Sequence, residues 1–331
     1  MTASACLTAG FDIVARYPLL IALPVLLDML LWLGPRLSVA PLALAWQAFI
    51  NRRLTVVAPT SEAREGYLLM EQLLERVAAE FNLFSAVSPA PLLGVPVLMP
   101  ARMTSAQPLM DARAIIVVDS LWAVVVWVSL ALVVGVMLST VYLTWIGQRV
   151  IRDTDAPLAG VDSLGQVGVR LAGSLVWLVV ITGGLLVAVM VVVQGIAMIS
   201  VMLGSFALLT ILSLAFFMAL HLLFVVPSIV QMRRSVWQAV RESILLARGD
   251  LFNTSLLVLF MMVITQGFMV VWQLPEPGSW AMLVGILGHA VISTALTTAL
   301  FIFYQERLNF LKTEQKVYTV KEVPVQPMAG D

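Results

Sequence analysis

SLWAVVVWVSLALVVGVMLSTVYLTWI, residues 120–146, contains no charged side chain. A helix rises about 1.5 Å per residue, so a run of this length crosses a hydrocarbon core about 30 Å thick. Five further apolar runs occupy residues 18–34, 171–193, 204–227, 252–274 and 281–304, and only the first is slightly short for a span. The pattern predicts an all-α fold: a polytopic membrane helical bundle of six transmembrane helices.

The composition agrees with a membrane protein and excludes several other classes. Of the 331 residues, 61% are hydrophobic and 11% are charged, against about 25% charged in an ordinary soluble domain. The 19 basic and 19 acidic residues cancel, so no net field recruits nucleic acid and we expect no such partner. Cys6 is the only cysteine, which excludes an intrachain disulfide and a zinc or iron–sulfur site built from cysteines of this chain alone.

The distribution of basic residues predicts the orientation. With six spans in the cell (inner) membrane and both termini cytoplasmic, twelve of the 19 basic residues lie inside: Arg16, Arg149, Arg152, Arg170, Arg233, Arg234, Arg241, Arg248, Arg307, Lys312, Lys316 and Lys321. The other seven lie in residues 36–113, a segment longer than the roughly 60 residues over which the positive-inside rule holds. We therefore expect both termini to be cytoplasmic.

Short amphipathic stretches precede the odd-numbered spans, at residues 5–16, 161–170 and 235–248. In the third, one helical face carries Val236, Val240, Ile244 and Ala247, while Gln238, Arg241, Glu242 and Arg248 lie elsewhere. Such stretches predict cytoplasmic interfacial helices. Three units of interfacial helix and two spans then follow one another, and two interpretations stay open: an internal repeat, or chance amphipathicity beside spans.

The chain divides into four parts along the sequence. Residues 1–34 form the N-terminal interfacial helix and the first span, and residues 35–113 form an extracytoplasmic segment ahead of the remaining spans, 114–308. Within this segment we expect one amphipathic helix at about 62–84, with Tyr67, Met70, Leu74, Val77, Phe81 and Phe84 at helical spacing. It is either a structural cap or a docking face for a partner or lipid. Residues 309–331 form a cytoplasmic tail, expected to be disordered beyond a helical extension of the last span.

Two segments in the C-terminal half carry a resemblance: Pro227 with Arg233-Arg234 and residues 239–249 (AVRESILLARG), and Tyr304-Gln305-Glu306-Arg307 at the end of the last span. They resemble segments of an uncharacterised six-span bacterial membrane protein family related to the membrane domain of glycerophosphodiester phosphodiesterases. That resemblance implies a membrane domain that accompanies a separate catalytic barrel in the phosphodiesterases. This chain has no soluble region long enough for such a barrel, and its long outer segment departs from the family plan.

Polar residues inside the predicted spans are the candidate site. Asp28 and His289 lie at similar depths below the outer surface, so they could form a proton-coupling pair or a hydrogen bond that fixes packing. Ala281, Gly285, His289, Ser293 and Thr297 recur at intervals of four, which indicates close helix packing or a polar path. His221, on the fourth span and nearer the cytoplasmic side, is expected to be a core or interface histidine and not a ligand.

No motif indicates chemistry: the sequence has no phosphate-binding glycine loop, no His-Glu-x-x-His helix and no Gly-x-Ser-x-Gly turn. We expect no cofactor, no metal and no enzymatic activity. The predicted function is that of an accessory or scaffold in a membrane assembly or in envelope lipid handling, with membrane lipids and a membrane protein as partners. The alternative is a secondary transporter that uses Asp28 and His289. An intramembrane enzyme would need a nucleophile and base that cannot be located.

Overall fold

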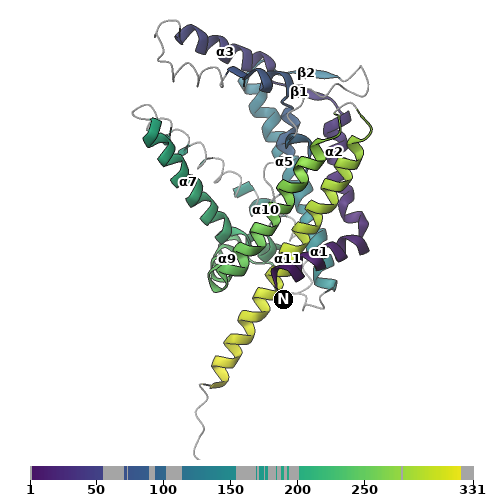
Figure 1. Ribbon diagram of the computed structural model, residues 1–331, viewed down its shortest axis with the longest axis vertical. Helices are drawn as coiled ribbons and strands as arrows, with labels where there is room; N and C mark the ends of the chain where they lie inside the picture. The colour runs from purple at the N-terminus through teal and green to yellow at the C-terminus, as the bar shows by residue number, and fades with distance from the viewer. Residues whose placement is uncertain are drawn as a thin grey trace, which may run out of the picture. The chain divides into compact units, whose positions relative to one another are not determined.

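The computed structural model of the chain describes residues 2–54, 71–88 without 73, 94–101, 114–153, 201–276 and 279–321, together with scattered positions between 169 and 193. These residues are almost all helical (Figure 1). They fall into two compact units: Met1–Ala15, Ile146–Met261 and Ala295–Asp331 form unit 1, and Arg16–Trp145 and Met262–Thr294 form unit 2.

Four helices in the described residues are long and apolar enough to cross a membrane. They are α5 (Leu121–Asp153), the consecutive helices α7 (Val201–Leu222) and α8 (Val225–Met232), α10 (Leu251–Gln273) and α11 (Met282–Lys321). These confirm apolar helices at the predicted spans 120–146, 204–227, 252–274 and 281–304. The predicted span 171–193 and interfacial stretch 161–170 lie mostly outside the described residues.

The first predicted span is bent where it meets the N-terminal helix. Helix α1 (Ala3–Arg16) and the segment Pro18–Leu33 meet at 96°, and counting this pair as one span would give five. The segment itself begins as a short 3-10 helix, η1 (Pro18–Ile21), and continues as α2 (Ala22–Leu33). Tyr17 has φ −125° and ψ 68°, because a residue that precedes proline is pushed out of the helical region. The bend therefore follows from the local sequence.

Unit 1 contains α1, α7, α8, α9 (Val236–Gly249) and the second half of α11. Helix α9 begins with a capping box: Ser235 accepts a bond from the backbone of Gln238, and the Gln238 side chain accepts one from the backbone of Ser235. Helix α1 approaches α11 closely, since a Cβ added at Gly10 would lie 2.5 Å from the carbonyl oxygen of Ala295. The helices predicted at 5–16 and 235–248 are thus present, and their place at a membrane surface stays a prediction.

Unit 2 holds most of the predicted outer segment. Two three-residue strands, β1 (Arg36–Ser38) and β2 (Ile115–Val117), pair in parallel with Arg36 opposite Ile115. Helix α3 (Ala40–Leu54) follows β1, and two short 3-10 helices, η2 (Leu83–Val87) and η3 (Met99–Ala101), lie farther along. The sequence predicted neither α3 nor the strand pair. Of the predicted helix at 62–84, residues 71–72 and 74–80 are helical, residues 81–82 are not, and η2 begins at Leu83. Residues 62–70 and 73 lie outside the described part.

The helices differ in how much of their apolar surface the protein covers. The apolar window of α11 is 78% buried, whereas those of α5, the α7–α8 helix and α10 are 17%, 28% and 17% buried. Uncovered apolar helix faces of this extent are typical of helices that face lipid. Helix α11 also continues to Lys321, which extends the last predicted span well into the segment 309–331.

Candidate functional site

The carboxylate of Asp28 is fully buried and holds the backbone of a distant segment. Its Oδ1 accepts hydrogen bonds from the backbone N–H groups of Leu98 (2.8 Å) and Met99 (2.9 Å), and its Oδ2 accepts a second contact from Leu98 (2.9 Å). A buried carboxylate is costly unless it is hydrogen-bonded, and here each oxygen has a backbone donor. Asp28 thereby attaches α2 to the chain where η3 begins.

His289 is also buried, and its ring contacts the Ser293 hydroxyl one turn later on α11, at 3.3 Å from Nε2. Within the described residues, no hydrogen bond or ion pair joins Asp28 to His289. Thr297 is buried in unit 1, whereas Asp28, His289 and Ser293 belong to unit 2. The structure therefore gives Asp28 and His289 different partners.

The small residues beside His289 mark a close helix contact. A Cβ added at Gly285 would lie 3.3 Å from the carbonyl oxygen of Trp272, and one added at Gly288 would lie 2.3 Å from the Trp272 ring. Helix α10 thus packs directly against α11 at these positions. For this part of the four-residue stripe, the geometry favours the packing alternative over a polar path.

His221 lies at the end of α7, where the helix is interrupted before α8. Its Nδ1 lies 2.8 Å from the carbonyl oxygen of Phe217. Across the interruption, the hydroxyl of Ser243 on α9 donates to the carbonyl oxygen of His221 (2.6 Å) and accepts from the backbone N–H of Phe224 (3.0 Å). One side chain therefore satisfies two backbone groups that the break leaves without helical partners.

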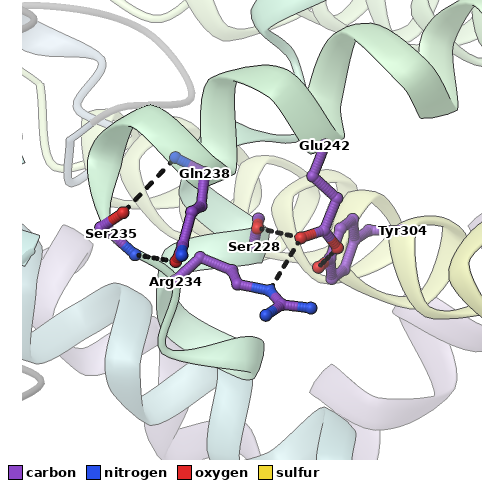
Figure 2. A network of polar contacts seen from close by, with 6 residues as sticks. All are labelled: Ser228, Arg234, Ser235, Gln238, Glu242 and Tyr304. Atoms are coloured by element: carbon purple, nitrogen blue, oxygen red, sulfur yellow. Dashed lines mark hydrogen bonds and ion pairs between the residues drawn. The ribbon is translucent and has the colours of Figure 1, made fainter.

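A polar network centred on Glu242 joins four segments of unit 1 (Figure 2). Glu242 Oε1 accepts from the hydroxyl of Tyr304 on α11 at 2.6 Å. Its Oε2 accepts from the hydroxyl of Ser228 on α8 at 3.2 Å and from Nε of Arg234, in the turn before α9, at 3.1 Å. Tyr304 is fully buried and the Glu242 side chain is 16% exposed. One carboxylate thus holds α8, the turn, α9 and α11 together.

The packed face of α9 is a different face from the apolar one that the sequence predicted would lie at the membrane surface. That apolar face was expected to carry Val236, Val240, Ile244 and Ala247, with Glu242 elsewhere on the helix. In the structure the buried residues are Ala239, Ser243, Leu246 and Ala247, and Val236 is exposed. Small side chains let the neighbouring backbone approach, so α9 buries its small-residue face and Glu242 turns inward beside it.

A second ionic contact lies at the start of α10. The guanidinium of Arg307 on α11 pairs with Asp250 Oδ2, and Asp250 also accepts from the side-chain amide of Asn253 at 2.8 and 3.0 Å. Arg307 lies over the Phe303 ring, 4.6 Å from its centroid. Residues 239–250 and 304–307 therefore meet through Glu242–Tyr304 and Asp250–Arg307. The segments that carry the resemblance, 239–249 and 304–307, include Glu242, Tyr304 and Arg307 but not Asp250.

The carboxylates of Asp28, Glu242 and Asp250 each accept hydrogen bonds from another segment of the chain, which is a structural arrangement. In the part of the chain that the structure describes, no group of three or more His, Cys, Asp or Glu residues is placed to hold a metal ion. Comparison of the chain with protein-family models, with curated proteins and with solved structures finds no match. The resemblance to the phosphodiesterase-related family therefore stays a prediction.

Proposed function

We propose that this chain is a multi-pass integral protein of the cell membrane that acts without chemistry of its own, as an accessory or scaffold in a membrane assembly or in envelope lipid handling. The long apolar helices, whose faces the protein leaves largely uncovered, support the membrane placement. Six spans and cytoplasmic termini complete the proposal, on the strength of the apolar runs and the basic residues of the sequence.

One observation carries the choice of an accessory role over a transporter. Asp28 is the acidic residue inside the first predicted span. Both of its carboxylate oxygens accept hydrogen bonds from the backbone N–H groups of Leu98 and Met99. A coupling carboxylate must exchange a proton or an ion with its surroundings during transport. A carboxylate that clamps two backbone donors is instead suited to holding a segment in place, so the secondary transporter that uses Asp28 and His289 is the weaker proposal.

The test is to extract the protein directly from cells into native lipid nanodiscs and to identify, by mass spectrometry, what copurifies in stoichiometric amount. The accessory role predicts a defined membrane protein or a defined lipid class, retained in excess over its abundance in the bulk membrane. A Leu245→Ser variant, which changes an exposed apolar side chain on α9, tests whether that helix takes part in the contact. Recovery of the chain with bulk lipid alone, and with no enriched protein or lipid, would refute the accessory role.

A further inference from the structure

A hollow of about 530 Å³ lies at the turn between α8 and α9 in unit 1. Arg233 and Arg234 line it from the turn, and Gln238 lines it from α9. Gly173, Ser174 and Trp177, which lie before α7 in the sequence, line its other side. Its volume lies within the range of about 300–1,000 Å³ that is usual for small-molecule sites. The hollow is therefore large enough for the headgroup of a lipid.

The turn that carries the two arginines has an unusual backbone. Arg233 ends α8 with φ 55°, in the left-handed region that residues other than glycine rarely adopt. This conformation reverses the chain between α8 and α9 and leaves Arg233 and Arg234 adjacent on the hollow.

The charges on the hollow are both positive, and one guanidinium is only partly engaged. Within the described residues, Arg234 contacts Glu242 through Nε alone, and its two terminal nitrogens point away from that carboxylate (Figure 2). The neutral polar groups have partners nearby: Gln238 takes part in the capping box, and the Ser174 hydroxyl donates to the Leu171 carbonyl at 2.8 Å. The hollow thus offers hydrogen-bond donors of positive charge, which suit a phosphate.

Apolar side chains lie on the same hollow. Val169 and Trp177 are 73% and 64% exposed, and Val236 is exposed at the first turn of α9. Tryptophan beside basic residues is typical of the boundary between hydrocarbon and water, where one end of a bound molecule is apolar and the other is charged. A soluble anion would contact only the arginines, whereas an amphiphile with a phosphate would contact both the arginines and the apolar side chains.

We propose that the hollow binds the headgroup of an anionic phospholipid, with the phosphate on Arg233 and Arg234 and the glycerol region against Trp177. This inference rests on the proposed membrane placement and gives the lipid-handling role a site and a ligand class. A phospholipid fits better than a free phosphate because its acyl chains enter the bilayer beside the exposed apolar side chains.

The experiment uses the full chain in nanodiscs of phosphatidylcholine and phosphatidylglycerol, with native mass spectrometry to count the phosphatidylglycerol that the released protein retains. The Arg233→Gln/Arg234→Gln variant removes both charges from the hollow. Arg241→Gln/Arg248→Gln removes the same charge from α9 at positions that do not line it. A basic residue anywhere at an anionic membrane surface contributes about 1 kcal/mol, or about fivefold in binding, and this applies to both arginine pairs. The hollow arginines should in addition donate charge-assisted hydrogen bonds to the phosphate, so their loss should weaken retention at least about tenfold more than the loss of the control pair.

A second pair of variants leaves the arginines and Glu242 intact. Gly173 lines the hollow, and a Cβ added there meets no described atom within 4 Å. Gly173→Leu therefore adds a bulky side chain to the lining and should lower retention. Gly184→Leu, also with no atom within 4 Å and not on the hollow, should not. Equal retention by Gly173→Leu and Gly184→Leu, or by the two arginine pairs, would overturn the proposal.

Added glycerol phosphate distinguishes a phospholipid headgroup from a soluble phosphate ester as the ligand. At concentrations matched to the lipid, it should leave phosphatidylglycerol retention unchanged. Displacement of phosphatidylglycerol by glycerol phosphate would overturn the proposal of a phospholipid in favour of a soluble phosphate ester. Failure of the chain to enter nanodiscs would refute the membrane placement itself. Entry with unchanged lipid retention in all variants would refute only the hollow.

Discussion

A double-mutant cycle should show that Glu242 and Tyr304 are strongly coupled in their contributions to the free energy of unfolding. The bond is 2.6 Å long, and the fully buried tyrosine donates to a carboxylate that is 16% exposed. Hydrogen bonds to charged groups contribute about 1.5–3 kcal/mol, so Tyr304→Phe should lower the free energy of unfolding by that amount. Glu242→Leu also removes the bonds to Ser228 and Arg234 and leaves the tyrosine hydroxyl buried without its acceptor.

The two substitutions together should cost less than their sum. Once Tyr304 is phenylalanine, Glu242→Leu no longer leaves a buried hydroxyl without an acceptor, so the coupling energy should be about 1.5–3 kcal/mol. The contact with Arg234 adds little, because that side chain is 48% exposed and exposed ion pairs contribute about 0–1 kcal/mol.

The assay is reversible unfolding of the full chain in mixed micelles titrated with dodecyl sulfate and followed by tryptophan fluorescence. Tyr142→Phe is the matched control, because its hydroxyl donates to the neutral Thr294 hydroxyl at 3.0 Å and should contribute only about 0.5–1.5 kcal/mol. Additivity of the two substitutions within about 0.5 kcal/mol would refute the argument that Glu242 holds α9 to α11.

Three further perturbations follow from the packing. Ser243→Ala should lower the free energy of unfolding by about 1–3 kcal/mol, measured in the same titration, because it removes both contacts across the α7–α8 interruption. Gly10→Ala should lower the free energy of unfolding by about 1–3 kcal/mol, because the new Cβ is forced against Ala295. Gly267→Ala, whose new Cβ meets no atom within 4 Å, should instead raise the free energy of unfolding by about 0.5–1 kcal/mol. Equal effects of the two variants would contradict the close packing of α1 on α11. Burial raises the pKa of the Cys6 thiol from 9.0 to about 11, so maleimide labelling at about pH 8 should be slow until the protein unfolds, and rapid labelling of the folded chain would show that Cys6 is accessible.

The apolar helices could be predicted from the sequence because their signal is local. The runs at 120–146, 252–274 and 281–304 begin within a residue or so of α5, α10 and α11, since charged and turn residues bound them. Length alone did not reveal the 96° bend between α1 and α2. Pro18 was the available signal, because the residue before proline avoids the helical region.

The contacts between distant segments could not be predicted in this way. Strand β1 pairs with residues 115–117, and no periodicity within either three-residue strand specifies a partner so far along the chain. The partners of Asp28 are likewise backbone N–H groups of Leu98 and Met99, and backbone groups leave no mark in the sequence. The sequence singled out polar residues inside apolar runs, but their partners depended on the fold.

Helix α9 shows that the most hydrophobic face of a helix need not be the face that packs inside the protein. Counting apolar residues favours Val236, Val240 and Ile244, whereas the structure buries Ala239, Ser243 and their neighbours. In a helix beside apolar spans, close approach depends on small side chains more than on hydrophobicity, because large apolar residues are equally stable facing lipid. The inward position of Glu242 follows from that choice.

The most direct test of the proposed accessory role is Asp28→Asn in proteoliposomes, with stability and proton-coupled solute uptake measured on the same preparation. An asparagine keeps the size of the side chain but replaces one acceptor oxygen by an amide donor, which should lower the free energy of unfolding by about 1.5–3 kcal/mol. If Asp28 only holds the segment at Leu98 and Met99, the variant shows this loss and neither protein takes up solute in response to a proton gradient. Uptake by the wild type that Asp28→Asn abolishes while stability stays unchanged would contradict the accessory role and establish Asp28 as a coupling residue.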